Sequence, residues 1–213
     1  MAARDYGQYG GAARALELVG ERWALLIVRD LLVGPRRYGE LAAGLPRIPS
    51  NILAARLKEL QAAGVIRRAP RSRVIIYELT SYGRELEPIV LALGAWGFKA
   101  LGDPREEQII TPDSMTMDLR TAFQPEVAAD LPATAYAARL GAAELLIRVD
   151  GPSLDVKRGD GPADLAFRAG ADIRRLISGE IAPDRAIATG VVEVLHGRGL
   201  LLDRFATTFH LAA

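Results

Sequence analysis

The sequence predicts an α+β protein in two parts, an N-terminal winged helix-turn-helix domain followed by a C-terminal α+β domain. Apolar residues recur at helical spacing over residues 12–64, and a two-fold alternation follows directly over 65–79. A second set of alternating strands and short helices begins at residue 145. With 213 residues, the chain is long enough for two modest domains.

Two helices are predicted at the start of the chain, over residues 12–19 and 21–32. The second carries a wide apolar stripe that includes Trp23 and Leu26, and we expect this stripe to be buried. Gly34 and Pro35 break the chain, and a short helix over 36–43 follows. The turn at 45–49 leads into the helix around which this domain is organised.

This central helix begins at Ser50, which we expect to be its N-cap, and ends before Gly64, a typical C-cap residue. Leucines at helical spacing form one face. The opposite face is short near the start and basic further on, which suits a helix inserted end-first into a DNA major groove. A plain surface helix is the alternative. The residues of this outer face are Asn51, Ala54, Ala55, Arg56 and Lys58.

After Gly64, strands over 65–68 and 74–79 predict a hairpin whose connecting segment, 69–73, is basic and exposed. A hairpin directly after a helix-turn-helix is a wing, whose arginines would contact phosphates or a minor groove. Thr80 is predicted to cap a helix over 81–101. This helix has more apolar residues than one small domain covers. The excess is interpreted as a dimer seam, although packing against the second domain would serve equally well.

The charge of the chain is asymmetric. Residues 1–102 contain 15 Lys and Arg against 9 Asp and Glu, whereas residues 103–213 contain 12 against 17. Residues 36–73 alone hold nine basic side chains and two acidic ones. Such a concentration indicates a polyanionic partner, double-stranded DNA, for the N-terminal part. A solvated arginine-rich surface is the alternative.

Residues 10–101 resemble the HxlR-type winged-helix transcriptional regulators, a MarR-like group, through ALELVGERWALLIVRDLLVGPRRYGEL, IPSNILAARLKELQAAGVI and YELTSYGREL. The resemblance implies a homodimer that binds a roughly palindromic operator. It also implies that Arg36 and Arg37 contact backbone phosphates, and that Arg71 and Arg73 form the wing tip. Many relatives carry a sensor cysteine near the start of this domain, and here that switch is absent. The groove-facing residues that it implies are Ser50, Asn51, Ala54, Ala55, Arg56 and Lys58.

The domains are predicted as 1–102, a linker with a connecting helix at 103–124, and an α+β domain of antiparallel strands and covering helices at 125–213. The motifs DIRRLISG, APDRA and GVVEV in this last part resemble the sterol carrier protein type 2 fold. The resemblance implies an apolar tunnel for a hydrophobic small-molecule effector, although the same side chains could simply fill a core. The residues expected to line the tunnel are Leu176, Ile177, Ile187, Leu201, Phe205 and Phe209.

The sequence offers no recognisable catalytic constellation. It contains no cysteine and only two histidines, His196 and His210, so we expect no enzyme activity, metal site or cofactor. No apolar run approaches the ~20 residues of a membrane span, and the N-terminus lacks a signal-peptide core. These features predict a cytoplasmic location. The rival hypothesis is a winged helix for protein association joined to a lipid carrier, and the basic excess at 36–73 argues against it.

Overall fold

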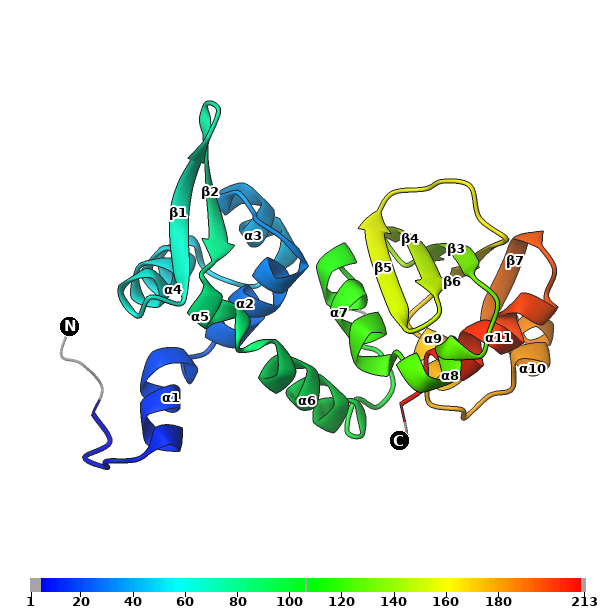
Figure 1. Cartoon of the computed structure of the whole chain (residues 1–213), viewed down its shortest axis with the longest axis horizontal. Helices are drawn as coiled ribbons and strands as arrows, with labels where there is room; N and C mark the ends of the chain where they lie inside the picture. The colour runs from blue at the N-terminus through cyan, green and yellow to red at the C-terminus, as the bar shows by residue number, and fades with distance from the viewer. Residues whose placement is uncertain (1–4, 106, 212–213) are drawn as a thin grey trace. The chain divides into compact units, whose positions relative to one another are not determined.

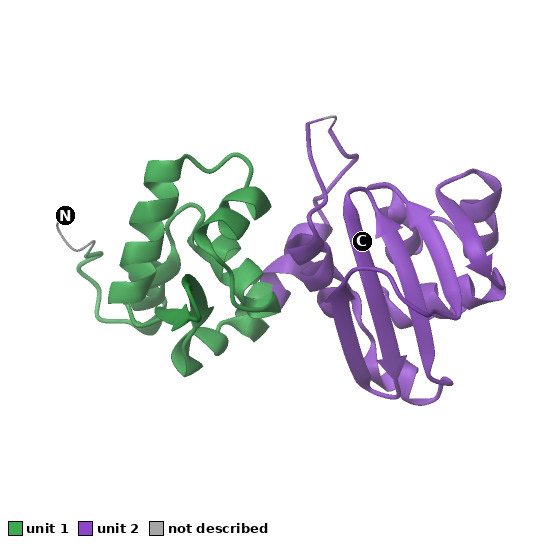
Figure 2. Cartoon of the chain, turned by 90° about the horizontal axis from the view of Figure 1, so that it is seen from above, with its two compact units in different colours: residues 1–90 green, residues 91–213 purple. Residues whose placement is uncertain are grey.

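The structure is a computed structural model that describes residues 5–105 and 107–211. The chain divides into two compact units, residues 1–90 and 91–213 (Figure 2). This division falls inside a helix, whereas the sequence predicted a boundary after residue 102. Glu106, in the expected linker, lies outside the described residues.

Unit 1 consists of short helices packed against a two-stranded ribbon (Figure 1). Its core is built from Leu, Ile and Val of the second and fourth helices and from the bases of both strands. The predicted helix-turn-helix and hairpin are both present. The elements are α1 (Gly11–Val19), α2 (Ala24–Val33), α3 (Tyr38–Gly44), α4 (Ser50–Ala62), β1 (Ile66–Arg71), β2 (Val74–Leu79), α5 (Ser81–Arg84) and α6 (Glu87–Phe98), of which α6 crosses into unit 2.

The start of α2 differs from the prediction. Trp23 precedes the helix in a left-handed conformation with φ of 81°, and the guanidinium of Arg22 lies 5.1 Å from its ring centroid. Trp23 is therefore only half-buried and contacts a cation. Leu26 is 40% exposed. The predicted apolar stripe is narrower than expected because nothing in unit 1 covers this flank of α2.

The single helix predicted over 81–101 is broken in two. Thr80 caps α5 as predicted, because its hydroxyl accepts a hydrogen bond from the Gly83 N–H at 3.0 Å. The same hydroxyl donates to the Gly64 carbonyl at 2.6 Å and so ties α5 to the end of α4. Pro88 explains the break, because proline lacks an N–H and is tolerated only in the first turn of a helix. The chain restarts as α6 at Glu87.

Unit 2 is a five-stranded sheet with order β5-β4-β3-β6-β7, covered by helices on one face (Figure 2). The strand pair β3 and β6 is parallel and the others are antiparallel, so the sheet is mixed rather than antiparallel as predicted. The elements are α7 (Pro112–Ala122), α8 (Pro125–Ala129), β3 (Thr134–Leu140), β4 (Ala143–Asp150), β5 (Ser153–Arg158), β6 (Leu165–Ala169), α9 (Ile173–Ile177), α10 (Pro183–Ala188), β7 (Val192–Gly197) and α11 (Leu200–Thr208).

An aromatic cluster forms the centre of the unit 2 core. The ring of Phe205 lies 5.3 Å from Tyr136, 5.2 Å from Phe167 and 4.7 Å from Phe209, centroid to centroid. All four are fully buried. Helix α7, predicted as part of a connection, belongs to this core through Met115, Leu119 and Ala122. The opposite face of the sheet carries charged side chains.

Candidate nucleic-acid interface

Helix α4 is the element that the sequence predicted would enter a DNA groove. Leu53, Leu57 and Leu60 hold it on the core. It ends in a Schellman motif: the Gly64 N–H donates to the Gln61 carbonyl at 3.1 Å, and the Val65 N–H donates to the Leu60 carbonyl at 3.0 Å. Gly64 supplies the left-handed conformation with φ of +72°, as predicted. The N-cap is Pro49 and not Ser50, which is the first helical residue.

Helix α3 fixes the start of α4. The Tyr38 hydroxyl donates a hydrogen bond to the Ser50 carbonyl at 2.9 Å. Helix α3 is itself closed at its start, where the Arg37 N–H donates to Glu40 Oε2 at 2.6 Å. The first turn of α4 therefore has a defined position within the helix-turn-helix, which reading a sequence through a groove requires.

The outer face of α4 is small at its start. Ser50, Asn51 and Ala54 are exposed, Ala55 is half-buried, and Lys58 is exposed one turn further on. Short side chains at the tip leave room for base edges, and Asn51 offers a donor and an acceptor to them. A single ammonium at Lys58 suits a phosphate.

Arg56 corrects the sequence prediction. Its side chain does not lie on the outer face: the residue is only 8% exposed and pairs with Glu59 on the same helix and with Glu21, at 3.4 Å, beyond the end of α1. The long guanidinium bridges two elements of unit 1 instead of reaching solvent. Arg56 is therefore a structural residue of the domain, and we leave it out of the interface.

The wing is a longer ribbon than predicted, because β1 continues through Pro70 to Arg71. A two-residue loop joins the strands, with Ser72 in the left-handed region at φ of 56°. Arg71 and Arg73 both lie at this tip and are exposed. Along the ribbon, buried Glu78 pairs with Arg67 at 2.7 Å and with Arg71 at 3.7 Å. The tip projects away from the helices of unit 1 (Figure 1).

Arg36 and Arg37 lie between the helix-turn-helix and the wing. Arg36 joins the ribbon as a bridge partner of Tyr77, with backbone hydrogen bonds of 2.9 and 2.7 Å. Its side chain is half-buried, and Nη1 donates to the Pro35 carbonyl at 2.9 Å. Arg37 is exposed at the start of α3. Arg37 is thus the more accessible of the two for a phosphate.

Two further exposed arginines belong to this surface and were not singled out from the sequence. Arg47 precedes α4, and Arg68 lies on β1. The signal was present, because both fall within the basic segment 36–73. We define the basic surface of unit 1 as Arg37, Arg47, Lys58, Arg68, Arg71 and Arg73.

The residues expected to line a tunnel in unit 2 are mostly packed in its core. Leu176, Phe205 and Phe209 are buried, Ile187 is 37% exposed, and Leu201 is half-buried. Ile177 alone of this set also lines a cavity, of about 410 Å³, together with α6, α7 and α9.

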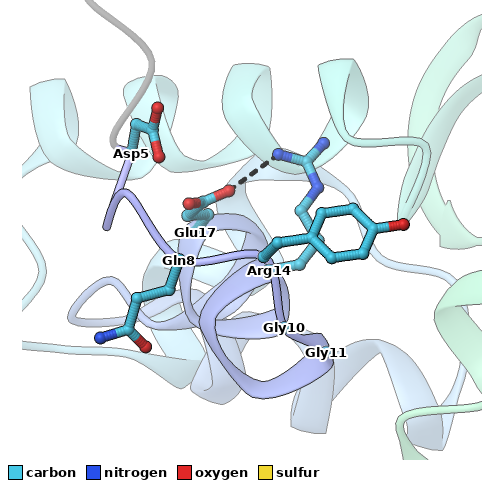
Figure 3. A pocket seen from close by; sticks show the side chains of 7 residues that line it. Asp5, Gln8, Gly10, Gly11, Arg14 and Glu17 are labelled. Atoms are coloured by element: carbon cyan, nitrogen blue, oxygen red, sulfur yellow. Dashed lines mark hydrogen bonds and ion pairs between the residues drawn. The ribbon is translucent and has the colours of Figure 1, made fainter.

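A hollow beside α1 is open to solvent (Figure 3). Its charged groups satisfy one another: Arg14 pairs with Glu17 at 3.0 Å, and the Tyr6 N–H donates to Glu17 Oε1 at 3.1 Å. Among the described residues, no cluster of three His, Asp or Glu side chains could hold a metal ion. Within the same part of the chain, no helix has the length and apolar character needed to cross a membrane.

A helix-turn-helix followed by a two-stranded ribbon defines a winged helix, and an exposed basic surface over both parts is typical of winged helices that bind DNA. A model of the HxlR-like helix-turn-helix family matches residues 18–104. The uncharacterized HTH-type transcriptional regulator YvaP of Bacillus subtilis is 40% identical over 86 residues, which are 39% of this chain and 80% of YvaP. The chain belongs to the HxlR-like helix-turn-helix family.

An uncharacterized HTH-type transcriptional regulator of Mycobacterium tuberculosis is 45% identical over 94 residues, which are 43% of this chain and 59% of that protein. The match thus spans less than two thirds of the mycobacterial protein. Among solved structures, the reduced form of the transcriptional regulator YodB from B. subtilis matches 45% of this chain and 100% of its own, with 31% identity and a TM-score of 0.40.

Proposed function

We propose that this protein is a cytoplasmic transcriptional regulator that binds double-stranded DNA as a homodimer. The observation that carries the proposal is the tip of α4, where small exposed side chains stand on a helix whose start is fixed by Tyr38. The basic surface of unit 1 surrounds this tip and supplies charge for phosphates. Its relatives of the HxlR-like family are named transcriptional regulators.

The proposed contacts divide by chemistry. Asn51 reads a base edge, for which adenine is the natural partner of a bidentate amide, while Ser50, Ala54 and Ala55 allow close approach. Lys58 and Arg37 contact phosphates, and Arg71 and Arg73 hold the neighbouring backbone from the wing tip. Phosphate contacts supply most of the affinity, whereas the tip of α4 supplies sequence preference.

Helix α6 supports the homodimer. It is apolar all round, yet within this fully described helix no residue is buried. Ile89 is 50% exposed, Leu93 44% and Trp96 74%, and their spacing places them along one side. A helix that is hydrophobic on every side is stable only when covered. A second copy of α6 provides that cover through an isologous contact.

The test of DNA recognition is footprinting of the full chain on the DNA upstream of its own gene. The expected result is a protected, roughly palindromic site whose half-sites lie about one helical turn, ~34 Å, apart. Protection that is uniform along the fragment at every protein concentration would show binding without sequence preference and would contradict the proposal.

The test of the dimer is sedimentation of Trp96→Asp. We expect this variant to be monomeric at concentrations where the unaltered chain is dimeric, because a carboxylate would be buried in the seam. Leu200→Asp is the matched control, since Leu200 is 76% exposed and lies at the start of α11 in unit 2. A dimer that survives Trp96→Asp would place the interface elsewhere.

Unit 2 is proposed to respond to a hydrophobic effector, as its resemblance to the sterol carrier fold implies. Its sheet is covered on one face by helices whose apolar side chains form a single core. A ligand that binds one state of the dimer more tightly than another would shift the population between them. Operator affinity would change as a consequence.

A further inference from the structure

The cavity that Ile177 lines lies wholly within unit 2, and its walls are mainly apolar. Its volume of about 410 Å³ falls in the range of small-molecule sites. Two exposed apolar side chains belong to its lining, Leu101 at 57% and Ile109 at 59%. The other apolar wall residues are Leu93, Phe98, Ile110, Met115, Ile173 and Ile177.

Two glycines on α6 create much of the space. At Gly94 an added Cβ would lie 3.1 Å from Thr121 Oγ1, so this position is close-packed against α7. At Gly97 an added Cβ would meet nothing within 4 Å. Because Gly97 lines the cavity, the space beside it belongs to the cavity itself. A larger side chain at Gly97 would therefore fill the cavity without a clash at its Cβ.

One hydrogen-bond donor stands in this apolar wall without a partner. Arg174 lines the cavity, and its Nε is buried and has no acceptor among the described residues. Its two Nη atoms are already engaged, Nη1 with Glu180 and Nη2 with Asp103 at 3.4 Å. Leaving a buried N–H unpaired costs ~1–3 kcal/mol, so a ligand atom that accepts from it would be favoured.

The charge of Arg174 is already balanced. Burial acts to raise the pKa of Glu180, but hydrogen bonds from Arg174 and Ser178 outweigh it and lower that pKa below its usual value. Glu180 is therefore ionised and neutralises the guanidinium. Asp118 adds a carboxylate to the cavity wall. A negatively charged ligand would gain little here, whereas a neutral acceptor would satisfy Nε at no cost in charge.

We propose that this cavity is the effector site of the protein, and that it binds a neutral, largely apolar small molecule through one oxygen or nitrogen acceptor at Arg174 Nε. The effector role rests on the proposed function, because α6 forms both a wall of the cavity and the proposed dimer seam. Ligand in the cavity would then act directly on the helix that joins the two copies. The core residues Phe205 and Phe209 have no part in this site.

The test uses Nile red, a neutral dye with a ring carbonyl, and the intact chain. We expect saturable binding that weakens at least tenfold in Gly97→Leu, which fills the cavity. Arg174→Lys keeps a cation near Glu180 but removes the Nε donor, and we expect it to weaken binding about tenfold, the worth of one charge-assisted hydrogen bond. Gly39→Leu, at a helical glycine of unit 1 with equally open surroundings, is the control and should bind as the unaltered chain does.

Undiminished dye binding by Gly97→Leu would overturn the site. Tighter binding of the anionic dye 1-anilinonaphthalene-8-sulfonate, unaffected by Arg174→Lys, would overturn the ligand class. Loss of the dimer in Gly97→Leu without loss of dye binding would show that the second copy fills the cavity, and would also overturn the proposal.

The effector role is tested by adding Nile red to the complex with the footprinted DNA. We expect the affinity for DNA to change in the unaltered chain but not in Gly97→Leu. Dye binding that leaves DNA affinity unchanged would refute the effector role alone. If the unaltered chain binds dye but no DNA, the proposed function fails while the ligand site stands.

Discussion

Replacing Arg56 and Lys58, two basic residues of α4, should separate stability from DNA binding. Arg56 is 8% exposed and holds Glu21 and Glu59, whereas Lys58 is exposed. Breaking a fully buried ion pair costs ~3–5 kcal/mol. Here the glutamate side chains are 31% and 36% exposed and would rehydrate. We therefore expect Arg56→Ala to lower the free energy of unfolding of unit 1 by ~1–2 kcal/mol, including the lost packing of its aliphatic stem.

Urea denaturation followed by the fluorescence of Trp23, which lies in unit 1, measures this loss. Since a domain of this size shifts its Tm by ~4–8 °C per kcal/mol, thermal melting would show it too. Lys58→Ala should leave unfolding unchanged but weaken binding to all duplexes and reduce the salt slope by ~0.9 for one phosphate contact. The reasoning would be refuted if Arg56→Ala kept full stability and relaxed operator preference, since Arg56 would then contact bases.

Three further outcomes are expected. Gly83→Ala would place a Cβ 2.0 Å from the Val65 carbonyl oxygen and should destabilise unit 1 by ~1–3 kcal/mol in urea denaturation, whereas Gly39→Ala, with nothing within 4 Å, should not; equal midpoints would contradict this. Asn51→Ala should relax operator discrimination by ~1–3 kcal/mol in competition binding without changing stability, and unchanged discrimination would remove Asn51 from the readout. Burial raises the pKa of Tyr136 from 10.0 to about 12, so the stability that its neutral form provides is complete below pH 10 and is lost as pH rises towards 12. Tyr136→Phe should remove this part of the alkaline destabilisation, measured by denaturation at pH 9 and 11; identical pH dependence in both proteins would refute it.

The sequence predicted the elements of unit 1 where a local signal defines them. Gly64 marks the end of α4 because a Schellman motif needs a left-handed residue there, and Thr80 marks the start of α5 because its hydroxyl can accept from the backbone. The hairpin follows from the change to two-fold alternation. The break before α6 was also readable, since Pro88 cannot lie in a helix interior.

Other features depend on contacts between distant segments. Arg56 lies beside the leucine stripe of α4, and helical periodicity does not tell which flank another element will cover. Strand β3 escaped the prediction because Tyr136, Ala137 and Ala138 are all buried in succession, which erases the two-fold pattern. The cavity in unit 2 brings together α6, α7 and α9, and only the folded chain shows that Gly97 and Arg174 share it.

The most direct test of DNA binding by the basic surface of unit 1 is the salt dependence of the affinity for a duplex of random sequence. If the surface meets phosphates from both copies of a dimer, log K should fall linearly with log salt concentration, losing ~0.9 for each phosphate contact. A joint replacement of Arg71 and Arg73 should lower that slope by ~2–4 across the dimer, depending on how many of the four side chains reach phosphates. Affinity that does not respond to salt, or a slope that both replacements leave unchanged, would contradict the account.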